Sequence, residues 1–195
     1  MPARFAPLVT PARRPVAQLL HDLQALGDLR QRVDEVEARL EAVRLDVDAL
    51  LPRLPFLRRR YARTLVHRCD AFELLLLTWS PGSASPIHDH DGQDCWFLPL
   101  AGTFDLDDYA IVDENDTHAR LTRLRTRRVA DGELDRRDQW ESLHSVTPAT
   151  PLAVSLHLYA RPIDRCRIFD RARGTWSWRL LGYDSIAGGA AGLGE

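Results

Sequence analysis

Two histidines separated by one residue lie near the middle of the chain, in the segment SPIHDHDGQDCWFLPLAG from Ser85 to Gly102. In an extended strand, the side chains of residues i and i+2 point to the same face, about 6–7 Å apart along the backbone. The imidazoles of His88 and His90 can therefore converge on one metal ion. Because neutral imidazole is the commonest metal ligand in proteins, the pair predicts a metal site.

Two glycines make this signal more specific than a histidine pair alone. Gly82 lies six positions before His88, and Gly102 lies twelve positions after His90. This is the spacing of the first cupin motif, G-x5-H-x-H-x4-E-x6-G, and Cys95 occupies the position of the glutamate. The spacing predicts a cupin β-barrel whose metal site lacks the usual carboxylate.

A third histidine is expected from a later strand, and His118, His144 and His157 are the candidates. His118 lies in the polar turn DENDTHAR, whereas His144 in ESLHSVTP lies where a turn-rich segment meets a strand. We therefore predict His144 as the third ligand. His157 shares a strand face with Ser155 and Tyr159 and is expected beside the metal rather than on it. The remaining histidines are expected to be structural or exposed: His21, His67 and His118.

Three neutral imidazoles without a carboxylate leave a divalent ion with its full charge and with positions open to other ligands. Imidazole suits zinc, iron, nickel and copper, so the ligand set alone does not select the metal.

The N-terminal part of the chain has a helical pattern. From Val16 to Leu51, leucine and valine recur mostly at steps of three and four residues, and Pro52 and Pro55 then end the pattern. Gly27-Asp28 can divide it into two helices. We expect residues 1–56 to pack as helices on the outer face of a barrel; the alternative is a coiled-coil arm for dimerisation.

Residues 57–186 are expected to form the barrel and residues 187–195 a flexible tail. Short turns separate strand-like runs without intervening helices, which predicts a mainly β, jelly-roll-like fold with N-terminal α-helices. The runs are AFELLLLTW (71–79), CWFLPLAG (95–102), FDLDDYAIV (104–112), ARLTRLRT (119–126) and LAVSLHLYA (152–160).

Composition excludes several classes of function. The 195 residues carry a net charge of −2 and all 26 basic residues are arginines, so neither nucleic acid nor an anionic membrane is an expected partner. Three widely spaced cysteines do not form a disulfide framework. The sequence has neither a secretory signal nor an apolar run long enough to span a bilayer, so a cytoplasmic protein is expected.

Five segments of the chain follow one another in a recognisable order: YARTLV (61–66), SPIHDHDGQDC (85–95), SLHSV (142–146), AVSLHLYARPID (153–164) and RCRIFD (165–170). Together they resemble the cysteine dioxygenase type I family. The resemblance implies a cupin with a non-haem Fe(2+) on three histidines, which converts L-cysteine and O2 to cysteine sulfinic acid. It therefore implies a small thiol and O2 as partners, in a monomer or in a homodimer through the N-terminal helices.

Carried over residue by residue, the resemblance implies that His88, His90 and His144 bind iron. Arg63, which precedes the first predicted strand, would bind the substrate carboxylate, with Tyr61 nearby. Tyr159 would be the active-site phenol, and Ser155 and His157 would form a hydrogen-bond relay to it. Cys95 corresponds to the cysteine that forms a thioether bond with this tyrosine in animal members.

The sequence leaves the substrate open. Animal members read Ser-Pro-Pro after the tyrosine, whereas this chain reads Ala160-Arg161-Pro162. In related 3-mercaptopropionate dioxygenases an arginine from this later region binds the carboxylate. Arg63 thus favours L-cysteine, and Arg161 keeps 3-mercaptopropionate as an alternative, together with cysteamine. A cupin that binds a metal or thiol without turnover is another class, and a cupin isomerase or zinc enzyme is disfavoured by Cys95 in the glutamate position.

Overall fold

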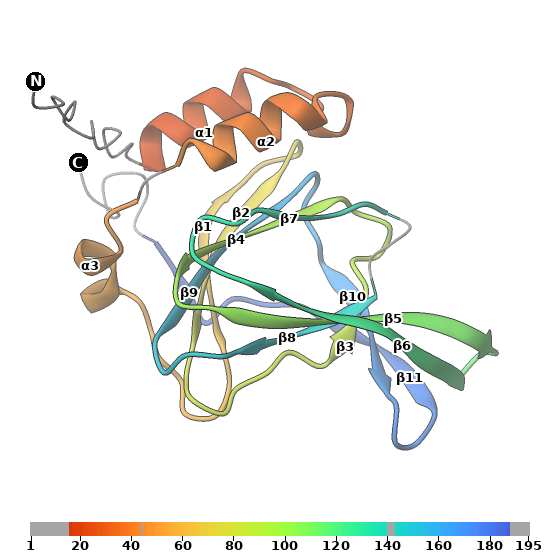
Figure 1. The fold of residues 1–195 in the computed structure, drawn as a ribbon. Helices are drawn as coiled ribbons and strands as arrows, with labels where there is room; N and C mark the ends of the chain where they lie inside the picture. Colours follow the sequence, from red (N-terminus) through yellow and green to blue (C-terminus); the bar gives the residue numbers. More distant parts are fainter. Residues whose placement is uncertain (1–15, 44, 140–142, 188–195) are drawn as a thin grey trace, which may run out of the picture.

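The apolar runs of the sequence form two six-stranded β-sheets. The computed structural model describes residues 16–43, 45–139 and 143–187. Side chains from both sheets, among them Leu75, Phe97, Phe104 and Val146, share one apolar core cluster, so the sheets pack face to face. The predicted mainly β cupin fold with N-terminal helices is therefore confirmed (Figure 1).

The first sheet contains β1 (Ala62–Arg68), β2 (Glu73–Trp79), β4 (Cys95–Ala101), β7 (Asp135–Arg137), β9 (Ala153–Tyr159) and β12 (Ser185–Ile186), in the order β12-β1-β2-β9-β4-β7. The second sheet contains β3 (Ile87–His88), β5 (Phe104–Glu114), β6 (Ala119–Val129), β8 (His144–Pro148), β10 (Arg165–Asp170) and β11 (Thr175–Leu180), in the order β11-β10-β3-β8-β5-β6. The helices are α1 (Val16–Gln24), α2 (Val33–Glu41) and α3 (Val47–Leu50), with 3₁₀ turns η1 (Leu29–Gln31) and η2 (Leu51–Arg53).

The five predicted strand runs correspond to β2, β4, β5, β6 and β9. One expectation about position is wrong, because Arg63 does not precede the first strand but lies inside β1, opposite Leu77 of β2. A side chain inside a strand has a fixed face, so β1 determines the direction in which Arg63 can reach.

β2 and β9 are buried along their whole length, so neither strand has a face toward solvent. Their odd-numbered residues, such as Leu75, point into the space between the sheets. Their even-numbered residues, such as Leu74 and Leu156, pack in a second cluster that contains the helical leucines. A strand that is buried on both faces must be covered on both, and here the helices supply the second cover.

The helices lie over the outer face of the first sheet, where α1 and α2 run side by side (Figure 1). Leu19 and Leu23 of α1 and Val36 and Leu40 of α2 are buried in the same cluster as Trp96 of β4. The apolar stripe of this region is thus buried within the chain itself. The expected tail at 187–195 lies outside the described residues from 188 onward.

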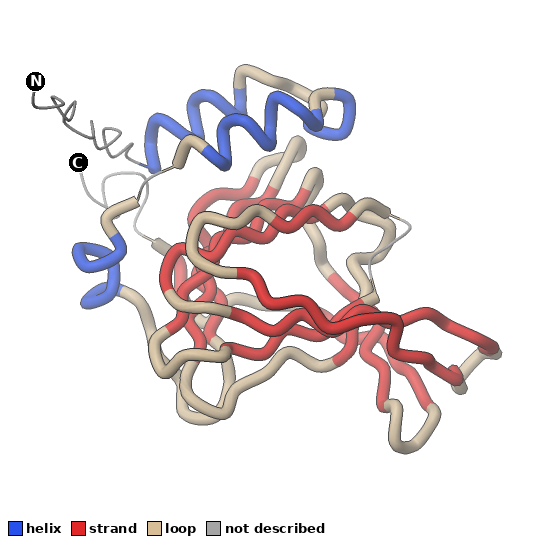
Figure 2. Tube along the Cα trace, viewed as in Figure 1, coloured by secondary structure: helices blue, strands red, loops and turns tan. Residues whose placement is uncertain are grey.

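A long hairpin of β5 and β6 extends beyond the body of the barrel (Figure 2). Its strands exchange ion pairs across their register: Arg128 Nε lies 2.8 Å from Asp105 Oδ1, and Arg125 Nε lies 2.6 Å from Asp108 Oδ2. The arginine-rich run of β6 is therefore matched by aspartates on β5, in the cross-strand pairs that stabilise a half-exposed sheet.

Among the described residues, no helix combines the length and the apolar character that crossing a membrane requires.

The two glycines of the cupin motif provide a matched test of the fold. Both have positive φ, +75° at Gly82 and +80° at Gly102. A Cβ on Gly82 would meet no atom within 4 Å, whereas a Cβ on Gly102 would overlap with Thr150 Oγ1 and the Leu152 carbonyl oxygen. We predict that Gly82→Ala lowers the free energy of unfolding by about 1 kcal/mol. Gly102→Ala adds the cost of displaced packing, about 1–3 kcal/mol more. Urea unfolding of the metal-free proteins measures both, and equal losses would contradict the role of Gly102.

Candidate metal centre

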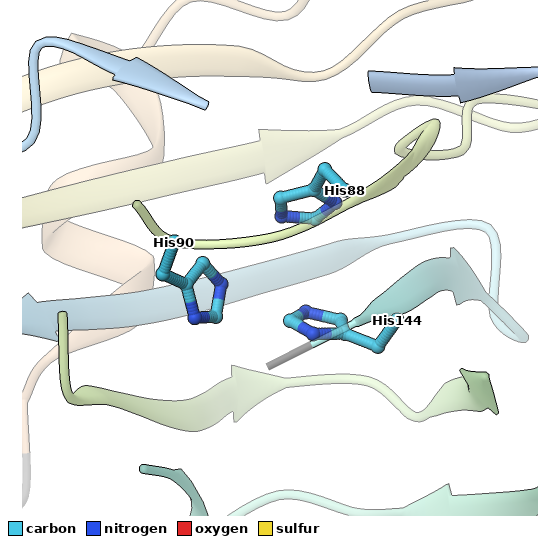
Figure 3. Close-up of side chains that lie close together, drawn as sticks. All are labelled: His88, His90 and His144. Carbon is cyan, nitrogen blue, oxygen red and sulfur yellow. The ribbon is translucent and has the colours of Figure 1, made fainter. Parts of the chain in front are cut away.

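Three histidines from two neighbouring strands and the turn after one of them face one another (Figure 3). His88 and His144 are direct partners across β3 and β8, and His90 lies just beyond the end of β3. Each ring offers one nitrogen such that all three nitrogens lie within 4.8 Å of one another. The sequence prediction of His144 rather than His118 as the third member of the cluster agrees with this geometry.

The protonation of these rings suits a metal. The His88 Nδ1 lies 2.9 Å from the Pro86 carbonyl oxygen, which can only accept, so Nδ1 carries the proton and Nε2 keeps its lone pair. Burial lowers the pKa of His88 and lowers that of His90 well below its usual value. Both imidazoles are therefore neutral near pH 7. His90 Nδ1 is buried without a hydrogen-bond partner among the described residues.

Asp89, between the two histidines of the motif, fixes their loop to β10. Its Oδ2 accepts a 2.6 Å bond from Arg167 Nε, and its Oδ1 accepts a 2.9 Å bond from the Arg167 backbone N–H. Arg167 in turn bonds Glu114 Oε2 at 3.1 Å and lies over the Trp176 ring at 5.4 Å. Asp89 is thus not a replacement for the missing glutamate ligand. It supports the loop that carries the two histidines.

A pocket between the sheets opens onto the three histidines. Tyr61, Arg63, Trp79, His157 and Tyr159 all contribute to its walls. Tyr61 and Trp79 pack with ring centroids 4.8 Å apart. Arg63 is only 8 % exposed, and its two terminal nitrogens have no hydrogen-bond partner among the described residues. A buried guanidinium with free N–H groups is suited to bind a carboxylate that enters the pocket.

A hydrogen-bonded chain lies along the inner face of β9. Trp79 Nε1 donates to Ser155 Oγ at 2.9 Å, and Ser155 Oγ lies 2.9 Å from His157 Nε2. Burial, with a further contribution from the Arg63 charge, lowers the pKa of His157 to about 3. His157 is therefore a neutral imidazole that Ser155 holds in a fixed orientation.

Tyr159 lies on the same face, with its ring 5.7 Å from the His90 ring. Burial raises the pKa of its phenol well above the ordinary value, so the hydroxyl keeps its proton. Cys95 is the direct partner of Tyr159 across β4 and β9. Side chains at such opposed positions have Cβ atoms about 4.5–5.5 Å apart. Burial also raises the pKa of the Cys95 thiol, and a hydrogen bond with Tyr159 opposes this effect.

The structure brings most of the predicted site residues together, but Arg161 is not among them. Arg161 is exposed, does not line the pocket, and its charge acts on Asp28 at the helical region. The residues that line the pocket and that the sequence did not single out include Cys166 and Arg179, which are partners across β10 and β11. The sequence offered only alternation within RCRIFD as a signal for Cys166.

Comparison with known proteins finds a matching family model, similar curated proteins and aligned solved structures. The model of the family "Cysteine dioxygenase type I" matches residues 7–172. Cysteine dioxygenase type 1 of Homo sapiens is 32 % identical over 160 residues, which cover 80 % of this chain and 78 % of the human protein. The Bos taurus protein of the same name is 31 % identical over 174 residues, which cover 88 % and 85 %. Among solved structures, an RmlC-like cupin protein from Desulfovibrio desulfuricans aligns at a TM-score of 0.44 and 20 % identity, over 56 % of this chain and 91 % of that one.

The bond between Asp89 and Arg167 makes a prediction about metal affinity. Arg167→Ala removes the side-chain donor that holds the loop between His88 and His90, and supports of this kind affect metal affinity by about 10–100-fold. We expect the dissociation constant for Fe(2+) or Co(2+) to rise by about this factor in a competition titration with a chelator. Arg128→Ala, which removes an exposed ion pair with Asp105, is the control and should leave the affinity unchanged. Equal affinities in the two variants would contradict the role of Arg167.

Proposed function

Because the chain belongs to the cysteine dioxygenase type I family, we propose that it oxidises L-cysteine with O2 to cysteine sulfinic acid. The coarser description, a thiol dioxygenase of this family with a three-histidine metal site, follows from the family and from the cluster of His88, His90 and His144. The observation that carries the finer proposal is Arg63. Its guanidinium lies in the same pocket as the histidines, with buried terminal nitrogens that have no hydrogen-bond partner among the described residues.

We propose ferrous iron as the metal, with His88, His90 and His144 as its ligands. The donor set fits, because three imidazoles without a carboxylate would leave positions for the thiolate and amine of a substrate and for O2. Bound there, ferrous iron supplies a Lewis acid that favours the substrate thiolate and a source of electrons for dioxygen.

Arg63 orients the substrate. A carboxylate held by two N–H groups of a buried guanidinium has a fixed direction as well as a favourable charge. The thiol of the same small molecule is thereby directed toward the histidine cluster. Arg161 is exposed and does not line the pocket, so it is not placed to hold a carboxylate beside the histidine cluster. This supports L-cysteine as the leading substrate and leaves 3-mercaptopropionate as the alternative.

In the pocket, Tyr159 keeps its phenol proton and His157 stays uncharged. The protonated phenol of Tyr159 can donate a hydrogen bond to the substrate carboxylate or to a reacting oxygen. His157 stays neutral, so it adds no second charge beside Arg63. The surrounding apolar side chains, among them Leu77 and Ile163, exclude water from the reacting groups.

The carboxylate assignment makes a kinetic prediction. We expect Arg63→Ala to raise the KM for L-cysteine by roughly 10–100-fold, as expected for loss of a charged hydrogen-bond partner. Activity on cysteamine (2-mercaptoethylamine), which has no carboxylate, should change little. The measurement is O2 consumption by anaerobically iron-loaded protein, with products identified by mass.

Arg161→Ala is the matched control. It removes the arginine that lies two residues after Tyr159. We expect the KM to be unchanged for both L-cysteine and 3-mercaptopropionate. A rise in KM for Arg161→Ala but not for Arg63→Ala would overturn the assignment. Bound iron without O2 consumption on any thiol would instead support a binding role without turnover.

We also propose that Cys95 and Tyr159 form a thioether bond during turnover. Their position as direct partners across β4 and β9 supports this, since the thiol and the phenol ring are then neighbours. The bond joins Cys95 Sγ to a ring carbon of Tyr159 and releases two hydrogen atoms, with O2 as the oxidant.

Peptide mass spectrometry after turnover should therefore find one peptide pair that joins Cys95 to Tyr159 and is lighter by two hydrogens. Cys95→Ser cannot form this species and is the control. Recovery of two separate, unmodified peptides from fully turned-over protein would show that the bond does not form.

A further inference from the structure

A buried carboxylate lies behind the pocket. Glu73 is the first residue of β2 and is 0 % exposed. It is the direct partner of Tyr159 on β9, so it belongs to the same inner face as the groups of the site. The proposed reaction gives Glu73 no role, and a fully buried carboxylate requires partners.

Glu73 lies between two arginines of β1. Its Oε1 lies 3.5 Å from Arg63 Nη2, an ion-pair distance at which neither atom completes a hydrogen bond. Its Oε2 accepts a 3.1 Å bond from Arg68 Nη1 and a 3.3 Å bond from the Ile163 backbone N–H. One oxygen thus anchors Glu73 to the chain, and the other faces the guanidinium of the pocket.

A second layer of contacts continues to the surface. Arg68 Nη1 donates to the Tyr183 hydroxyl at 2.7 Å, and Arg68 Nη2 lies 2.6 Å from Asp164 Oδ1. The Tyr183 ring in turn lies under the Arg63 guanidinium, 5.7 Å from its centroid. Arg68 therefore has several partners, whereas Glu73 is the one carboxylate within ion-pair distance of Arg63 among the described residues.

The charges of this cluster are arranged in pairs. Arg68 lies within ion-pair distance of both Asp164 and Glu73, whereas Arg63 lies within ion-pair distance of Glu73 alone among the carboxylates of the described residues. A buried guanidinium with no anion nearby is unfavourable and would turn toward water. Glu73 allows Arg63 to stay buried before substrate arrives, and the long Oε1–Nη2 distance leaves the N–H groups of Arg63 free for a second carboxylate.

We propose that Glu73 is a positioning residue for Arg63, and that their pairing makes the pocket selective for thiols that carry a carboxylate. The proposal deepens the proposed function and rests on it. It concerns the affinity for the carboxylate end of the substrate and not the oxidation of the thiol.

The test is a double-mutant cycle with Glu73→Gln and Arg63→Ala. We expect Glu73→Gln to raise the KM for L-cysteine roughly tenfold while kcat stays within about twofold. The KM for 2-mercaptoethylamine should not change. In the Arg63→Ala background, Glu73→Gln should add nothing, because its partner is already absent.

Asp164→Asn is the matched control. It removes only the charge of an exposed carboxylate that pairs with Arg68 and leaves Glu73 in place, so the KM for L-cysteine should stay within about twofold. If Asp164→Asn raises the KM as much as Glu73→Gln, the whole network is merely structural and the proposal is wrong. A lower KM in Glu73→Gln, or an additive effect with Arg63→Ala, also overturns it.

Two further measurements keep the test independent of folding and of turnover. If Glu73→Gln does not fold, Glu73→Asp retains the charge but withdraws it from Arg63, and a smaller rise in KM is expected. Calorimetry of 3-mercaptopropionate binding to metal-loaded protein under argon compares the same variants without oxidation of the thiol. Absence of sulfinate from the wild-type protein counts against the proposed function, whereas unchanged binding in the Glu73 variants counts against this inference.

Discussion

The register of β9 between β2 and β4 is the constraint on which the site depends. It places Ser155, His157 and Tyr159 on the inner face, opposite Phe97 and Cys95 on β4. Because successive side chains of a strand alternate between faces, a slip of one residue would turn all three toward the helices. The leucines on the other face of β9 pack in the same cluster as the helical leucines, which fixes this register.

The two sheets contribute different side chains to the pocket. The second sheet and its adjoining turn supply the three histidines, through the pairing of β3 with β8 and the loop held by Asp89. The first sheet supplies Arg63, His157 and Tyr159, which line the pocket from the other side. Face-to-face packing of the sheets therefore sets the distance between the histidine cluster and Arg63, and hence, under the proposed function, the size of thiol that can reach both.

The sequence predicted the long strands and the histidine cluster because each has a local signature. The motif glycines with His88 and His90 are such a signature, and so are the apolar runs of β2 and β9. The two-residue strand β3 and the start of β1 have none, which is why Arg63 was expected outside the sheet. The ion pair of Arg63 with Glu73 and the outward position of Arg161 result from how strands and loops pack, and no spacing in the sequence encodes them.

The central claim is that this pocket joins both atoms of O2 to the sulfur of a small thiol. The most direct test supplies isotopically labelled dioxygen and L-cysteine to anaerobically iron-loaded protein, and determines the mass of the product. The account predicts cysteine sulfinic acid with both sulfinate oxygens labelled. Label in one oxygen or in neither, or conversion of cysteine to its disulfide alone, would contradict it.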